Sequence, residues 1–181
     1  MKFVKFGILL SLVFSLTACS ISTDDLPIKE ITDTVTESVS NSGILEGANE
    51  VFTYVQNTQE SFQELMNIGG QWSEVYNAAS NGTITNEELA SRVTNEILPL
   101  NEELMTQIEN YVAPTDATSK INDLLVNAVS TQHDALQEVV NGIQNGDYSV
   151  LNSANQLMSD VQGFEGEFTK MIQNIITEYG F

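Results

Sequence analysis

The sequence is poor in positive charge, cysteine, histidine and proline. Its 181 residues include six Lys and Arg residues against 25 Asp and Glu residues, with one Cys, one His and three Pro. A chain this acidic lacks the clustered basic side chains that bind nucleic-acid phosphates, so no nucleic acid is expected as a partner. One Cys excludes a disulfide within the chain and a zinc site built from several thiolates. One His excludes the paired Glu-x-x-His motif of di-iron bundles.

A short apolar segment follows two lysines, Lys2 and Lys5, at the start of the chain. It runs from Phe6 to Leu16, which is too short to span about 30 Å of hydrocarbon as a helix. A positive start followed by a short apolar core is typical of a secretory signal peptide. We therefore expect residues 1–18 to be removed. The net charge would then be −21, because these residues hold two of the six bases and none of the acids.

The apolar segment ends in the sequence Leu-Thr-Ala-Cys at residues 16–19. This resembles the lipobox of bacterial lipoproteins, in which an aliphatic residue and two small residues precede a Cys. The resemblance implies that Cys19 becomes the N-terminus and carries a diacylglyceryl group on its sulfur, with palmitate as a typical acyl chain. Two acyl chains hold a protein stably on a bilayer, because each buried CH₂ contributes about 0.8 kcal/mol. The alternatives are a secretory leader with an incidental Cys, or an uncleaved membrane helix.

This anchor would place the protein on the extracytoplasmic face of a cell membrane. Ser20 follows the Cys, where an Asp is associated with retention in the inner membrane, so a Gram-negative host would send the protein to the outer membrane. We expect residues 19–43 to form the lipidated Cys and an acidic tether. The spacing of Ile28, Ile31 and Val35 also allows a short amphipathic helix within it.

From residue 44 onward, apolar residues recur at spacings of three and four, which is typical of helices with one buried face. Four such stripes are separated by short breaks; they run over Leu45–Ala79, Leu89–Val112, Ala117–Ile143 and Val150–Tyr179. Loops of a few residues force consecutive helices to run antiparallel. The sequence therefore predicts an all-α fold, an up-down-up-down antiparallel four-helix bundle over residues 44–181.

Two features interrupt these stripes. Pro99 predicts a kink near Asn95–Pro99, because proline removes a helix hydrogen bond and clashes with the preceding turn. The pair Gly69-Gly70 weakens the first helix. The glycines either open a concave surface beside Trp72, where a small apolar ligand could bind, or locally adjust the backbone so that Trp72 fits the core.

The stretch Asn77–Glu88, NAASNGTITNEE, resembles an EF-hand calcium loop, with Gly82 at its sixth position. The possible ligands at positions one, five, seven, nine and twelve are Asn77, Asn81, Thr83, Thr85 and Glu88. Asn replaces the usual Asp at the first position, and Ala79 offers no ligand at the third. A single carboxylate implies weak binding. The same Gly, Thr and Glu also suit a tight helix–turn–helix connection with a capping box, so both interpretations stay open.

No catalytic constellation is visible in the sequence. His133-Asp134 is the one His–acid pair, and no G-x-S-x-G turn accompanies it. Neighbouring acids such as Glu102-Glu103 point in different directions on a helix and do not converge on one site. No phosphate-binding glycine-rich loop is present, so we predict no catalytic residue, no cofactor and no enzymatic activity.

As a whole, the chain is similar to small lipoproteins of Bacillus-type bacteria, with residues 141–158, NGIQNGDYSVLNSANQLM, closest in character. The resemblance implies a location and no activity. We expect a lipid-anchored, non-enzymatic binding or scaffolding protein of the cell envelope, whose partner is another envelope protein or a second copy of itself. The alternative is a ligand-sensing module that uses the 77–88 loop or a site near Trp72.

Overall fold

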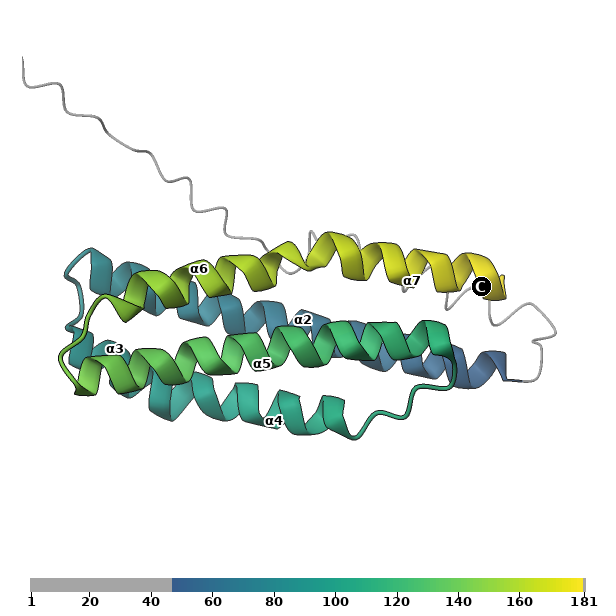
Figure 1. Cartoon of the computed structure of the whole chain (residues 1–181), viewed down its shortest axis with the longest axis horizontal. Helices are drawn as coiled ribbons and strands as arrows, with labels where there is room; N and C mark the ends of the chain where they lie inside the picture. Colours follow the sequence, from purple (N-terminus) through teal and green to yellow (C-terminus); the bar gives the residue numbers. More distant parts are fainter. Residues whose placement is uncertain (1–46, 181) are drawn as a thin grey trace, which may run out of the picture.

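The computed structural model describes residues 47–180, and helices account for all the regular structure in that range (Figure 1). Four rods lie side by side. The first is α2 (Ala48–Ser80); the second contains α3 (Asn86–Arg92), a π-helical turn (Val93–Ile97) and α4 (Leu98–Glu109); the third is α5 (Asp116–Gln144); the fourth contains α6 (Val150–Gly163) and α7 (Glu165–Tyr179). Consecutive rods run in opposite directions, which confirms the predicted all-α, up-down-up-down bundle. The predicted signal peptide (1–18) and tether (19–43) lie outside the described residues.

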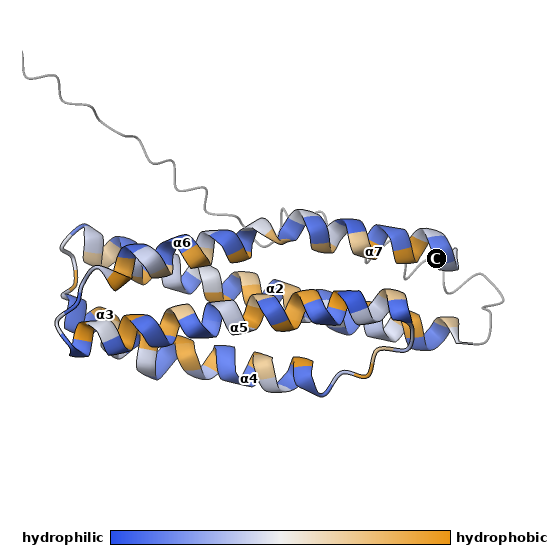
Figure 2. Cartoon of the chain, in the orientation of Figure 1, coloured by the Kyte–Doolittle hydropathy of each residue, from blue (hydrophilic) through white to orange (hydrophobic). Residues whose placement is uncertain are grey.

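The core forms because every rod contributes an apolar stripe. Apolar and polar residues are interleaved along each helix (Figure 2), and the apolar ones that face inward are buried. Phe62 of α2 stacks on Phe168 of α7 with ring centroids 4.2 Å apart, and this contact joins the first rod to the fourth. Within residues 47–180, no helix combines the length and apolar character that crossing a bilayer requires.

The α2–α3 connection is a glycine turn that closes the end of α2. The Thr83 N–H donates to Ala78 O at 2.8 Å, and the Gly82 N–H donates to Ala79 O at 2.9 Å. These two bonds define the Schellman motif, which requires a left-handed residue; Gly82 supplies it with φ +70°. The α5–α6 connection repeats the pattern at Gly146, which has φ +74°. Both turns lie at the same end of the bundle, which we call the turn end (Figure 1).

The second rod contains a π-helical turn where the sequence predicts a kink. The Leu98 N–H donates to Val93 O, five residues earlier, instead of to the residue four earlier. Pro99 follows in the first turn of α4. Because the proline ring crowds the carbonyl of Asn95 and has no N–H to donate, the widened turn accommodates it without ending the rod.

The fourth rod differs from the prediction of one continuous stripe. It is divided at Phe164, which has φ −71° and ψ −14° and separates α6 from α7. The Phe164 N–H bonds to Val161 O, three residues earlier, so the chain tightens at this point. Gly163 and Gly166 flank the break and lower the local preference for helix.

Candidate functional site

A network of polar side chains crosses the core near its middle. Asn101 of α4 donates through Nδ2 to Gln132 Oε1 of α5 at 3.0 Å and to Val129 O at 3.3 Å. Gln132 Nε2 donates to Leu65 O of α2 at 3.2 Å. Both amide side chains are fully buried. Because the two backbone carbonyls can only accept, they fix the orientation of both amides, and the network joins three of the four rods.

His133 extends this network toward the surface instead of forming a catalytic pair with Asp134. Its Nδ1 lies 3.0 Å from Asn101 Oδ1, and its Nε2 lies 2.7 Å from Gln137 Nε2. Since Asn101 Oδ1 can only accept, Nδ1 carries the imidazole proton and Nε2 accepts from Gln137. His133 therefore acts as a bridge between the buried amides and the surface of α5.

Trp72 lies in the core, with 1% of its surface exposed. Helix α2 continues through Gly69 and Gly70 without a break, so the glycines do not open the bundle. A Cβ at Gly69 would lie 3.6 Å from Gln132 Nε2, which places the buried network directly behind this glycine. Trp72 Nε1 has no hydrogen-bond partner within the described chain. A small apolar ligand near Trp72 stays a prediction, and it would have to displace core side chains.

Part of the 77–88 loop forms the capping box that its sequence also suggests. Thr85 Oγ1 accepts from the Glu88 N–H at 3.1 Å, and Glu88 Oε2 accepts from the Thr85 N–H at 2.7 Å. The Glu88 carboxylate is thus turned toward the first turn of α3, where it satisfies a free backbone donor.

The remaining candidate calcium ligands belong to the end of α2 and to the glycine turn that follows it. Asn77 Nδ2 donates to Ser73 Oγ at 3.4 Å, and the Asn81 N–H donates to Asn77 O at 3.0 Å. Thr83 takes part in the glycine turn through its backbone N–H. No group of three His, Cys, Asp or Glu side chains that could hold a metal occurs between residues 47 and 180. Calcium binding at 77–88 stays a prediction.

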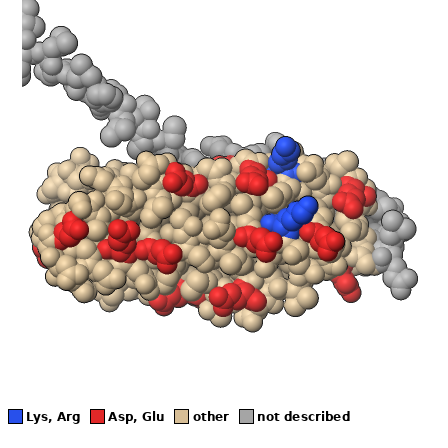
Figure 3. Space-filling view, in the orientation of Figure 1, with Lys and Arg blue, Asp and Glu red and all other residues tan. Residues whose placement is uncertain are grey.

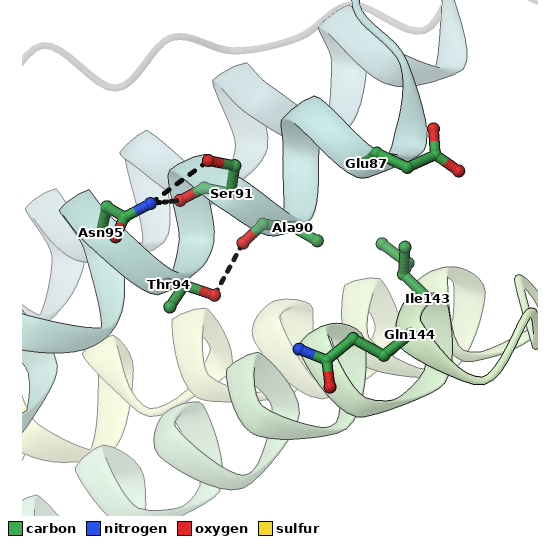
Figure 4. A pocket seen from close by; sticks show the side chains of 7 residues that line it. All are labelled: Glu87, Ala90, Ser91, Thr94, Asn95, Ile143 and Gln144. Carbon is green, nitrogen blue, oxygen red and sulfur yellow. Dashed lines mark hydrogen bonds between the residues drawn. The ribbon is translucent and has the colours of Figure 1, made fainter.

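A groove at the turn end, with a volume of about 450 Å³, is the candidate binding site that the sequence did not indicate. It lies between the α3 segment with its π-helical turn and the last turn of α5 (Figure 4). Its lining residues are Glu87, Ala90, Ser91, Thr94, Asn95, Ile143 and Gln144. We call it the π-turn groove. It is an open groove on the surface, not an enclosed cavity.

Hydrogen bonds within α3 and the π-helical turn orient the groove's polar side chains. The Thr94 hydroxyl donates to Ala90 O at 2.8 Å, and Asn95 Nδ2 donates to Ser91 O at 2.7 Å and to Ser91 Oγ at 3.2 Å (Figure 4). These bonds use the donors of Thr94 and Asn95 within their own helix and leave oxygen atoms available to a ligand.

Glu87, which lines this groove, is bonded by Tyr148 from the neighbouring turn. The Tyr148 hydroxyl donates to Glu87 Oε1 at 3.3 Å across the two turns of this end, and Tyr148 is 46% exposed. Glu87 Oε2 stays open to a ligand because the bond uses only one carboxylate oxygen. Asp147, in the neighbouring turn, accepts from the Ser149 hydroxyl and N–H at 2.6 and 3.0 Å, and these bonds lower the pKa of its carboxyl group.

A second groove, of about 470 Å³, lies at the opposite end of the bundle. Its lining residues are Asn49, Glu50, Thr53, Tyr54, Asn57, Asn110, Tyr111 and Val112. The Tyr54 and Tyr111 rings meet edge to face at 6.1 Å, and Val112 is 85% exposed. Burial, with the nearby Tyr111 and Asp123, raises the pKa of Tyr54 well above its ordinary value. This groove lies where the chain enters α2.

The surface is acidic throughout, with few compensating bases. Residues 47–180 contain 19 Asp and Glu residues and three Lys and Arg residues. Acidic groups are spread along the face in Figure 3, whereas the basic groups of that face lie in its right half. One ion pair is present among these residues, between Arg92 and Glu96 at 3.3 Å on an exposed helix face. Most of the acids therefore lack a basic partner within the described chain.

Cys19, the predicted lipidation site, lies outside the described residues. No protein family, curated protein or solved structure matches this chain.

Proposed function

We propose that this protein is a lipid-anchored, non-enzymatic binding or scaffolding module on the extracytoplasmic face of a bacterial membrane. The lipobox-like sequence that ends in Cys19 supports the anchor, and the four-rod bundle supports a scaffolding role. The partner is another envelope protein.

The observation that carries the proposal is the position at which α2 begins. Helix α2 starts at the end of the rod opposite to both glycine turns (Figure 1). An anchor that precedes α2 would hold that end toward the membrane and direct the turn end away from it. With 33 residues, α2 spans about 50 Å at 1.5 Å per residue. The π-turn groove and Tyr148 would therefore meet a partner at a distance from the bilayer.

Two side chains that could support catalysis, His133 and Glu88, are engaged in structural roles, which favours binding over an enzymatic function. His133 bridges Asn101 and Gln137, and Glu88 caps α3. Unpaired acids along the rod would also keep it from lying on an anionic membrane surface.

The anchor is tested by expressing the full chain with Cys19→Ala beside a control, Ser20→Ala. We expect the control to stay in the membrane fraction and to carry a diacylglyceryl mass on its first residue. Cys19→Ala should be released or remain as an uncleaved precursor. A processed, membrane-bound Cys19→Ala protein would contradict lipidation.

The binding role is tested by placing a photo-crosslinking amino acid at Tyr148 and, in a second variant, at Val112. Both side chains are exposed, and they lie at opposite ends of the rod. We expect one discrete adduct in intact cells from position 148 and none from position 112. If neither position gives a discrete adduct, the binding role is wrong.

A further inference from the structure

We propose that the π-turn groove binds a cationic side chain, a guanidinium or ammonium group, from a basic segment of the partner protein. This inference rests on the proposed binding role and adds the chemistry of the partner.

The groove offers more hydrogen-bond acceptors than donors. Thr94 and Asn95 direct their donors into their own helix, so Thr94 Oγ1 and Asn95 Oδ1 can accept from a ligand. Glu87 adds a carboxylate oxygen that Tyr148 does not use, at the other end of the groove and turned away from Thr94 and Asn95 (Figure 4). Gln144 reaches toward the groove from the facing helix with its amide nitrogen on the side of Thr94, so it offers donors as well as an acceptor (Figure 4). A ligand that fits this set must be rich in donors, as guanidinium and ammonium groups are.

The electrostatic field at the groove also favours a cation. Gln144 is the last residue of α5, where the helix carries a partial negative charge, whereas Glu87 lies in the first turn of α3, where the partial charge is positive, so the two helix ends oppose each other. No Lys or Arg lines the groove, and Glu87 contributes a full negative charge. The excess of 19 acids over three bases in residues 47–180 adds a long-range attraction for basic partners.

The apolar part of the groove suits the stem of a long basic side chain. Ala90 and Ile143 line the groove and are largely buried, so they can pack against methylene groups while the charged head reaches the acceptors. The apolar part of the groove is therefore compatible with the aliphatic stem of a basic peptide side chain.

The test is a titration of the ¹⁵N-labelled chain, residues 19–181, with Nα-acetyl-arginine amide, followed by NMR. A monovalent ligand avoids the general attraction of polycations to this acidic surface. We expect chemical-shift changes confined to the amides of residues 87–95 and 143–148. The neutral analogue Nα-acetyl-citrulline amide should produce no such changes, because it keeps the shape and loses the charge.

Two variants assign the binding to the groove. Glu87→Gln removes the charge at almost constant shape, and we expect it to weaken arginine binding about tenfold. Glu103→Gln removes an exposed acid of α4 outside the groove and should leave binding unchanged. Unperturbed signals in the other rods establish that each variant is folded.

Several results would overturn the inference. In the NMR titration, these are equal chemical-shift changes with the arginine and citrulline ligands, or changes at acidic residues along the whole rod. An unchanged arginine affinity in Glu87→Gln would also overturn it. So would the same chemical-shift changes with N-acetylglucosamine oligomers in place of arginine. If Tyr148 crosslinks a partner equally well in wild type and Glu87→Gln, the cation site is wrong and the binding role stands. If no partner is captured, the binding role itself fails.

Discussion

Asn101 and Gln132 form a 3.0 Å hydrogen bond inside the core, where neither side chain is exposed. The bond is directional, because Val129 O and Leu65 O each accept from one of the two amides. It therefore fixes how α4 pairs with α5, in a bundle whose apolar contacts alone would tolerate a shift along the helix axes. Each amide also depends on the other for a partner.

The network predicts strong coupling between these two residues. Asn101→Leu and Gln132→Leu should each lower the free energy of unfolding by about 1–3 kcal/mol, because each leaves a buried polar group without a partner. The double variant should lose clearly less than the sum of the two. Urea unfolding of all four proteins measures the coupling. Additive losses would mean that the bond does not determine the packing.

Replacing Gly142 of α5 and Gly70 of α2 by alanine should change the stability of the protein in opposite directions. A Cβ at Gly142 would clash with the Val150 side chain, at 2.7 Å from Cγ1, and would lie 2.9 Å from Asp147 O. Gly142→Ala should therefore lower stability by about 1–3 kcal/mol. Gly70→Ala meets nothing within 4 Å on an exposed helix face and should raise it by about 1 kcal/mol. Thermal unfolding of the two variants gives the comparison, and a loss at Gly70 would contradict it.

Tyr54 predicts a loss of stability at alkaline pH. Burial raises its folded-state pKa above the ordinary value of 10.0, so the folded protein holds the phenolic proton more tightly than the unfolded chain does. The contribution of Tyr54 to the free energy of unfolding is therefore fully present below pH 10 and falls as the pH rises above that value. Tyr54→Phe should make stability less dependent on pH above 10. At neutral pH this variant loses the 3.1 Å hydrogen bond from the Tyr54 hydroxyl to Asn122 Oδ1. Urea midpoints between pH 8 and 11 test this.

The capping box and the calcium loop predict different behaviour for the same residues. As a cap, Thr85→Ala should lower the free energy of unfolding by about 1 kcal/mol, with or without calcium. As a calcium loop, millimolar calcium should raise the thermal midpoint, and Glu88→Gln should abolish the increase. Because Thr85 and Glu88 bond each other's backbone, we expect the first result. A calcium-dependent midpoint would favour the second.

The rods and their ends could be predicted from the sequence because local rules determine them. Leu136 and Val139 continue a stripe at helical spacing, and both are fully buried. Gly82 follows the last turn of α2, where only a glycine adopts the left-handed conformation without strain. Thr85 and Glu88 lie three residues apart and form the predicted capping box.

The polar network and the groove could not be predicted, because they depend on which helix faces which. Asn101 occupies an inward position that the apolar pattern assigned to Leu100, which is half-buried. The π-helical turn explains the difference, since one extra residue rotates the face that points inward. Gln132 fills a gap between Ala128 and Leu136 in the third stripe, and that gap was the available signal.

Gly47 and Gly180, the two ends of the described chain, lie at the same end of the rod (Figure 1). A fluorescent protein or affinity handle fused after Phe181 would therefore crowd the end where the chain enters the bundle, at the Tyr54–Tyr111 groove, and leave the glycine turns accessible. Reporter fusions that are intended to preserve contacts at those turns therefore belong at the C-terminus. An insertion at Gly82 or Gly146 would block the contacts that a partner makes there.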